Sequence, residues 1–313
     1  MQDWHSRPVQ LKFRLGERTL FTRTLRLEVC DVPLRPDPAA AVDAPQPPQR
    51  TLPPDCAGFL LRSLPVSAAQ PRWRTCAGWL CYTPMQFERC YIDLHQSFAE
   101  YKAKFSSKSR STIARKVRRF GEQFGGRIAW RRYASVDEMA QFHAMARVVS
   151  ARTYQERLLD AGLPESPGFL REIQGLAARG LARGYILFDA DKPVAYLFCP
   201  VREDALLYQY LGYDPAYMSW SPGTVLQWLA LESLFAEQRF ALFDFTEGQS
   251  EHKRFFATGR QRCANVYFLR RTAGNAALVL GHLGLASLSE GAGALLERVG
   301  LKARVRRLIR FGV

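Results

Sequence analysis

The stretch Ala205-Leu-Leu-Tyr-Gln-Tyr-Leu-Gly-Tyr213, followed closely by Ser219-Trp-Ser-Pro-Gly-Thr224, decides the fold of this chain. The first part has the aromatic and branched residues of a β-strand, and the second opens a helix that continues through the apolar run 225–236. A second strand, 240–245, runs into the charged segment 246–253. A strand–helix–strand unit brings the first helical turn and the ends of both strands to one edge of a sheet, where we expect a site.

The composition indicates a folded protein with an anionic partner. The 313 residues, 47% of them hydrophobic, are enough for a full core in two subdomains. The net charge of +15 suits nucleic acid, anionic lipid or a phosphorylated cofactor. Seven scattered cysteines do not form a disulfide framework, and there is neither an apolar signal core nor an uninterrupted apolar run of about 18 residues. We therefore expect a reduced, cytoplasmic protein.

Three regions follow one another along the chain. Residues 1–100 predict a small β-rich subdomain, with alternating residues of a hairpin at 11–29 and eight prolines in an irregular segment at 33–54. Residues 101–272 form the main domain. Residues 273–313 predict a basic amphipathic helical tail, whose last turns carry Arg298, Lys302, Arg306 and Arg310 on one face.

The main domain alternates helices and strands. It begins with the basic run 102–119, which holds eight Lys or Arg residues and no acid, and whose apolar residues recur at helical spacing. Ser135 and Glu138 predict a capping box, and Ser166-Pro167 the start of a helix that ends at Gly180. Strands are expected at 127–133, 185–188, 194–201 and 264–269, with a turn at 189–193.

The segment Ser221-Pro-Gly-Thr224 has two interpretations. Free N–H groups and the positive end of a helix dipole suit a pyrophosphate, and Gly223 lets a ligand approach the backbone. Alternatively, the Ser221 hydroxyl caps an ordinary helix whose first residue is proline. Cap chemistry alone accounts for the residues, so the segment by itself leaves both open.

Asp244, Glu247, Glu251, His252 and Lys253 crowd the end of the strand that follows this helix. Beside a reacting amine, a carboxylate or the histidine would act as general base, and Lys253 would hold an anionic group. The alternative is a solvated junction in which the acids cap the next helix.

Two further segments also have a functional and a structural interpretation. Thr153-Tyr-Gln-Glu-Arg157 is a polar break between helices, and Tyr154 either lines a substrate cleft or packs on the surface. Zinc-ligand residue types occur at finger-like spacing, but the cysteines lie in aromatic strand patterns that suit small buried residues, so we expect no metal. These residues are Cys76, Cys81, Cys90 and His95.

The basic run 102–119 lacks interleaved aromatic residues and any recognised reader motif, so nucleic acid is not an expected partner and a solvated surface helix is the default. The basic tail suits peripheral contact with an anionic membrane surface. The chain has no GxxxxGK[ST], no GxGxxG opening a βαβ unit, no HExxH and no GxSxG. Walker-type ATP hydrolysis, dinucleotide redox chemistry, zincin proteolysis and α/β-hydrolase chemistry therefore lose support.

In order and spacing, five segments between about 100 and 270 resemble the CelD-type acetyltransferases of cellulose biosynthesis, a branch of the GNAT superfamily related in fold to the FemAB aminoacyl ligases. The family usually has tyrosine before the lysine where this chain has His252, and the usual GNAT pyrophosphate signature is missing. The matching segments are the basic lead-in 105–119, Thr153-Tyr-Gln155, Tyr210-Leu-Gly-Tyr-Asp214, Ser221-Pro-Gly223, and Phe243-Asp-Phe-x-x-Gly248 followed by Lys253.

The resemblance implies an α/β (α+β) fold with a mixed, mostly antiparallel sheet flanked by helices. It also implies an acyl-CoA donor, an amine or hydroxyl acceptor, and no metal. The thioester would lie between strands 208–213 and 240–245, where backbone N–H groups polarise its carbonyl. Donor binding falls to Tyr210, Gly212, Tyr213, Ser221, Gly223 and Thr224, and substrate contact to Tyr154, Gln155 and Tyr208. The catalytic candidates are Glu247 as base, Asp244 as an orienting or structural residue, Lys253 as an orienting group, and His252.

The family association suggests an exopolysaccharide or other envelope precursor as acceptor, and a peripheral position at the inner membrane face. Two rival functions fit the same residues. One is a FemAB-type transferase that uses aminoacyl-tRNA, with the run 102–119 gripping RNA. The other is a non-catalytic nucleic-acid-binding or scaffold protein that keeps the fold.

Overall fold

A computed structural model describes residues 3–16, 18–153, 156, 162–248 and 250–298, the last seven of these by their backbone alone. The chain divides into two compact units. Arg89–Arg260 is one continuous unit, and the residues before it join those after it to form the other. Two long strands, β5 (Trp79–Asp93) and β12 (Gly259–Arg270), contribute residues to both units. The sequence placed the boundaries near residues 100 and 272, because it followed the start of the helices and not these strands.

The discontinuous unit is a β-sheet with one long helix. Its strand order is β1-β2-β3-β12-β5, with β4 paired to β5. The antiparallel pair β1–β2 confirms the predicted hairpin, and the proline-rich segment forms one short 3₁₀ turn and an isolated bridge from Val42 to Val66. The elements are β1 (Trp4–Leu15), β2 (Arg18–Asp31), η1 (Pro38–Ala40), β3 (Gly58–Pro65), β4 (Trp73–Cys76) and α8 (Ala273–Arg298).

Helix α8 packs on one face of this sheet. Val279 is buried there with Phe13, Leu60 and Tyr82, and Leu283 packs beside them. The predicted tail is thus helical as far as Arg298, and its other predicted basic residues, from 302 to 310, lie outside the described residues. None of the helices described has the length and apolar character needed to cross a membrane.

The continuous unit contains a mixed sheet in the order β5-β11-β9-β8-β7-β6, with β10 also paired to β8. All neighbours are antiparallel except β9 and β11, which are parallel. This confirms the expected mostly antiparallel sheet flanked by helices. The elements are α1 (Phe98–Ala103), α2 (Ser107–Gln123), β6 (Ala129–Tyr133), α3 (Val136–Ser150), α5 (Pro167–Ala178), β7 (Ala182–Asp189), β8 (Lys192–Arg202), β9 (Ala205–Leu207), β10 (Tyr210–Tyr213), η2 (Pro215–Trp220), α6 (Pro222–Glu237), β11 (Leu242–Asp244) and α7 (Glu251–Phe256).

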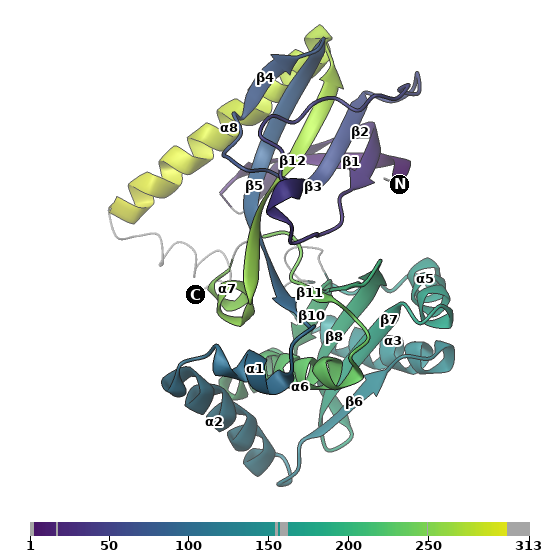
Figure 1. Ribbon diagram of the computed structural model, residues 1–313, viewed down its shortest axis with the longest axis vertical. Helices are drawn as coiled ribbons and strands as arrows, with labels where there is room; N and C mark the ends of the chain where they lie inside the picture. Colours follow the sequence, from purple (N-terminus) through teal and green to yellow (C-terminus); the bar gives the residue numbers. More distant parts are fainter. Residues whose placement is uncertain (1–2, 17, 154–155, 157–161, 249, 299–313) are drawn as a thin grey trace. The chain divides into compact units, whose positions relative to one another are not determined.

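Side chains on the central strands point alternately to two layers of helices, one on each face of the sheet. On β7, Tyr185 and Leu187 are buried against α1, α2 and α6, whereas Ile186 between them is buried against α3 and α5. Successive side chains of a strand point to opposite faces, so one short strand supplies both cores. Figure 1 shows α1, α2 and α6 gathered on one side of β7 and β8, and α3 and α5 on the other.

Serine caps fix where most of these helices begin. In five helices the N-cap serine oxygen accepts from the backbone N–H three residues later, which satisfies one of the free donors of the first turn. The Ser135–Glu138 capping box and the Ser166-Pro167 start are as predicted. The five caps are Ser97, Ser106, Ser135, Ser166 and Ser250.

The two ends of the continuous unit lie side by side. The N–H of Thr258, next to β12, donates to the carbonyl of Tyr91 on β5 at 2.8 Å. A side chain at position 259 would place its Cβ 2.3 Å from the Tyr91 ring, so only Gly259 permits this close approach. The chain therefore leaves the unit next to the point where it enters.

Candidate functional site

The parallel pair β9–β11 ends where the candidate site begins. The two strands pair residue by residue as far as Leu207 and Asp244, and the N–H of Tyr208 donates to the Asp244 carbonyl at 2.8 Å. Beyond this point the described residues of β10 pair with β8 alone. The strands thus part after Tyr208 and Asp244, and among the described strands β10 pairs with β8 on one side and with none on the other.

A one-residue bulge in the chain between β9 and β10 accompanies this parting. Leu206 pairs with Val201 and Tyr210 with Phe198, so four residue steps on one strand oppose three on the other. Bulges bend a strand and often occur next to active sites. The predicted continuous strand 205–213 was wrong in this respect, because its sequence carries no glycine or proline at the bulge.

Asp244, at the end of β11, forms a buried ion pair with Arg89. Its side chain has no exposed surface, and that of Arg89 on β5 is 6% exposed. Arg89 Nε donates to both Asp244 oxygens at 3.1 and 3.0 Å, and a terminal nitrogen donates to Oδ2 at 2.5 Å. Oδ1 also accepts from the N–H of Thr246 at 2.8 Å. These contacts hold the backbone where the strands part.

Thr246 is in the left-handed region, with φ of 58°. This is a rare conformation for a β-branched residue and costs of order 1–3 kcal/mol, so surrounding contacts must hold it. The Asp244 carboxylate supplies one such contact, and the Thr246 hydroxyl lies 3.5 Å from the Tyr208 carbonyl on the other strand. The left-handed backbone of Thr246 therefore turns the chain away from β9 at the point where the strands part.

The first turn of α6 differs from the serine-capped helices. Ser221 has φ of 54° and its side chain makes no capping hydrogen bond. The predicted hydroxyl cap was therefore wrong, because side-chain capping requires an extended N-cap backbone. The N–H groups of Thr224 and Val225 bond to the Ser221 carbonyl, whereas Gly223 has no carbonyl four residues back within the helix. The positive helix end is thus left without a side-chain acceptor.

Two glycines of the predicted donor site allow close packing. A Cβ at Gly223 would lie 3.3 Å from side-chain atoms of Leu211 and of Tyr213, both on β10. A Cβ at Gly212 would lie 2.5 Å from the Tyr196 ring. The first of these glycines therefore brings the start of α6 next to β10, which is a packing role in addition to the ligand approach that the sequence suggested.

The tyrosines around the bulge occupy different environments. The Tyr208 ring packs against Phe243 and Phe245 of the neighbouring strand, and burial raises its pKa well above the ordinary value. Burial also raises the pKa of Tyr210, on β10. Both phenols are therefore neutral at physiological pH and are suited to donate hydrogen bonds.

Charged candidates from the segment after β11 meet at α7. Lys253 Nζ donates to the Glu247 carbonyl at 2.6 Å. Burial lowers the pKa of Lys253, while the nearby carboxylates of Asp244 and Glu247 act in the opposite direction. The structure thus brings Asp244, Glu247 and Lys253 into one electrostatic group next to the parted strands.

His252 contacts α6. Its Nε2 lies 2.7 Å from Oε1 of Gln227, and its ring packs against Phe256. Desolvation, together with the positive charges of Lys116 and Lys253, lowers its pKa below the ordinary value. His252 is therefore a neutral imidazole at pH 7 and has the chemistry of a proton acceptor.

Two predicted substrate residues, Tyr154 and Gln155, lie outside the described residues. Their neighbour Thr153 is buried, and its hydroxyl donates to the Ser150 carbonyl and accepts from the N–H of Glu156. This part of the substrate site stays a prediction.

The residues weighed as zinc ligands have other surroundings. Cys76 contacts the side chain of Gln46, and His95 that of Asp93. Cys81 and Cys90 are buried in apolar clusters. Within the described ranges, no group of three or more His, Cys, Asp or Glu side chains could hold a metal ion.

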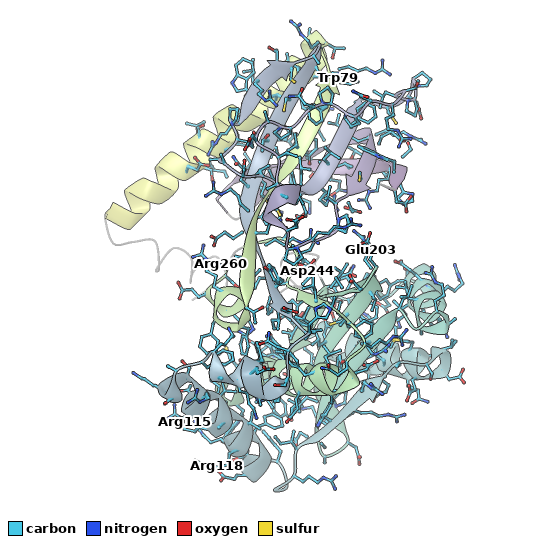
Figure 2. All side chains as sticks on the ribbon, viewed as in Figure 1. Trp79, Arg115, Arg118, Glu203, Asp244 and Arg260 are labelled. Atoms are coloured by element: carbon cyan, nitrogen blue, oxygen red, sulfur yellow. The ribbon has the colours of Figure 1, made fainter. Side chains whose placement is uncertain are left out.

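Sequence reasoning missed Arg89 and Gln227. Arg89 lies in Phe87-Glu-Arg-Cys90, where two successive charged residues between apolar ones do not predict a buried ion pair. Gln227 lies among the apolar residues 225–231 of α6, and a polar residue in that setting was a usable signal. In contrast, Arg115 and Arg118, labelled in Figure 2, project outward from α2.

A comparison with models of protein families shows which family this part of the sequence resembles. Residues 107–254 match the acetyltransferase (GNAT) domain family. The match covers just under half of the chain and falls entirely within the continuous unit. It includes the strand bulge, the start of α6 and the charged group at α7. The fold of this segment is GNAT-like, and the matching family is one of acetyltransferases.

Solved structures of low sequence identity also resemble the chain. FemX is 9% identical over 89% of this chain and 90% of its own, with a TM-score of 0.48. L-PGS from Bacillus licheniformis is 15% identical over 72% of each chain, with a TM-score of 0.43. A GCN5-related N-acetyltransferase from Kribbella flavida is 10% identical over 60% of each chain, with a TM-score of 0.34. No curated protein matches the sequence.

Proposed function

We propose that this protein is an acyl-CoA-dependent acyltransferase that transfers an acyl group to an amine or hydroxyl. The observation that carries the proposal is the parting of β10 from β11 beside the uncapped start of α6, within the segment that matches the acetyltransferase domain. Amides of a strand that pairs with another strand on one side alone suit a carbonyl, and the positive end of a helix suits a pyrophosphate. A CoA thioester contains both groups.

The residues of the site divide the work of binding. Amides around Ser221, Gly223 and Thr224 would hold the pyrophosphate at the positive end of α6. The N–H groups of Ser221 and Thr224 already bond to the carbonyls of Met218 and Ser221, so the Gly223 N–H is the donor that a ligand would satisfy. Tyr210, Gly212 and Tyr213 of β10 would lie along the donor, whose thioester supplies the activated acyl group. N–H groups of this strand that point away from β8 would stabilise negative charge on the carbonyl oxygen during transfer.

Acid–base roles follow from burial. Asp244, closed in by Arg89 and Thr246, orients the strand end. Glu247, which is half-buried, and His252 are the two candidates to take the proton from the acceptor, and Lys253 orients donor or acceptor. Tyr208 is a neutral hydrogen-bond donor to the substrate. Tyr154 and Gln155 complete the proposed acceptor side.

The resemblance to CelD-type enzymes supports an exopolysaccharide or other envelope precursor as acceptor. The basic composition supports peripheral contact with an anionic membrane surface, in the cytoplasm. Both parts of the proposal concern the partner and leave the donor chemistry unchanged.

A thermal-shift series with CoA thioesters tests the donor. A ligand at about 100 times its Kd stabilises the folded protein by roughly 2.7 kcal/mol. Thr224→Glu adds a negative charge in the first turn of α6, and Thr224→Gln is the uncharged control. The glutamate stabilises the free protein by about 0.3–1 kcal/mol relative to glutamine, because the helix dipole favours it.

The same glutamate opposes a bound pyrophosphate. At about 6 Å and an effective dielectric constant near 20, the repulsion is roughly 2–4 kcal/mol, or about 30- to 1000-fold in affinity. Opposite effects on free stability and on CoA binding are therefore expected. If no CoA thioester stabilises the protein, or if both variants bind CoA alike, the donor site is elsewhere; a shift with aminoacyl-tRNA alone would favour the rival transferase.

A further inference from the structure

Gln227 is an unusual residue in the core of the continuous unit. It lies on α6, five residues after Pro222, among the apolar residues Leu226, Ala230 and Leu231. Its side chain has no exposed surface. Oε1 meets Nε2 of His252, but Nε2 of the amide has no hydrogen-bond partner in the described part of the chain.

A buried amide with an unsatisfied donor lowers stability. The desolvation of the N–H₂ group is not recovered, whereas an apolar residue of the same shape would avoid the loss. Stability therefore does not account for glutamine at this position. Its polar contact with His252 is the feature that an apolar residue could not provide.

The contact determines which form of His252 is present. An amide oxygen only accepts hydrogen bonds, so Nε2 of the imidazole carries the hydrogen and donates it to Gln227. The lone pair is then on Nδ1, to which no described residue donates a hydrogen bond. A neutral imidazole held by one nitrogen, with the other free, is the arrangement of a general base.

The surroundings favour this neutral form. Lys116 on α2 and Lys253 on α7 face the ring with positive charge, and α6 presents the uncharged Gln227. Desolvation acts in the same direction and lowers the pKa of His252. The ring is nevertheless reachable, since His252 belongs to the exposed residues of α7.

We propose that Gln227 is a positioning residue that fixes the Nε2–H tautomer of His252, so that Nδ1 takes the proton of the acceptor. The inference rests on the proposed function. The acceptor's O–H or N–H bond breaks as its proton moves to Nδ1, and its lone pair forms the new bond to the thioester carbonyl carbon. The carbon–sulfur bond then breaks, and the leaving thiolate receives the proton from the imidazolium, which restores the neutral ring.

Nitrogen-15 NMR of the full-length protein tests the tautomer directly. The chain has five histidines, and His252→Gln identifies the signals of this one. We expect the Nε2–H tautomer in the wild type and a mixture of tautomers in Gln227→Met, which keeps the volume of the side chain. Nδ1–H as the main wild-type form would overturn the proposal.

Turnover of an acyl-CoA as a function of pH tests the role. His252→Gln is expected to lower kcat by about 10²–10⁴-fold, and Gln227→Met by less, with the donor KM unchanged in both. Gln227→Glu keeps the acceptor for Nε2–H but adds negative charge, so the acid limb of the kcat profile moves to higher pH. Gln227→Met melts no lower than the wild type, which separates a catalytic loss from unfolding.

The failures are distinguishable. If thioesters are turned over and His252→Gln or Gln227→Met leaves the rate and the acid limb unchanged, the pair has no part in proton transfer. If no thioester is turned over by the wild type, the proposed function fails and the role of His252 fails with it. The NMR result still decides whether Gln227 sets the tautomer.

Discussion

Arg89→Met tests how the parted strands are held. The substitution removes the guanidinium that donates to both oxygens of Asp244. The Asp244 carboxylate, which has no exposed surface, then stays buried without this partner. Removal of one partner of a buried ion pair costs about 3–5 kcal/mol, because the remaining charge loses its compensation. Lys253 is a second cation that interacts with Asp244, so we expect the lower half of this range.

A double variant separates the charge from the packing. In Arg89→Met/Asp244→Leu both charges are gone, and well-packed apolar replacements of buried pairs are neutral or stabilising. The Thr246 N–H loses its acceptor, which costs about 1–3 kcal/mol. We therefore expect the double variant to be more stable than Arg89→Met alone.

Urea unfolding followed by fluorescence measures these differences. The matched control is Arg118→Met on α2, where the partner Glu122 is 3.4 Å away and the two side chains are 70% and 65% exposed. Such a surface pair contributes at most about 1 kcal/mol. An Arg89→Met variant as stable as the Arg118→Met control, or a double variant less stable than the single one, would refute the reasoning.

Two further predictions concern stability. Backbone N–H groups of Ala134 and Ser135 lower the pKa of Glu138 from 4.5 to about 2, so the stability that its carboxylate contributes is present above pH 4.5 and is lost as the pH falls through 2. Glu138→Gln should therefore lower the free energy of unfolding in urea by about 1 kcal/mol at pH 7 and leave it unchanged near pH 2. An equal loss at both pH values would contradict this. Gly212→Ala places a Cβ 2.5 Å from the Tyr196 ring and should lower the stability of the protein by about 1–3 kcal/mol. Its control is Gly175→Ala, exposed on α5 with nothing within 4 Å of the added Cβ, which should raise the stability by up to about 1 kcal/mol. Equal melting temperatures of the two variants would show that β10 moves to accommodate the added methyl.

Much of the fold could be predicted from local chemistry. Ser135 with Glu138, and Ser166 with Pro167, mark helix starts because their side chains satisfy the first free amides. The strand–helix–strand unit of 204–256 was visible because its residue types change sharply at Ser221 and Phe240. These signals depend only on neighbours along the chain.

The rest depends on contacts distant in sequence. The bulge before Tyr210 arises from register with β8 and β11, which no local pattern records. Arg89 and Asp244 are 155 residues apart, so nothing near either one predicts the pair. Similarly, Ser221 looks like an ordinary cap in the sequence, and only its left-handed backbone shows that the hydroxyl does not serve as one.

The hydrogen bond between Tyr91 and Thr258 has a consequence for engineering the molecule. It joins the entrance and the exit of residues 89–260, so this segment behaves as an insertion whose host is interrupted at a single place. Such a segment can be excised, circularly permuted by a short linker across its ends, or grafted into a different host. The other unit, by contrast, is built from residues 1–88 and 261–313. Once residues 89–260 are removed, it needs a linker that joins these two stretches of chain.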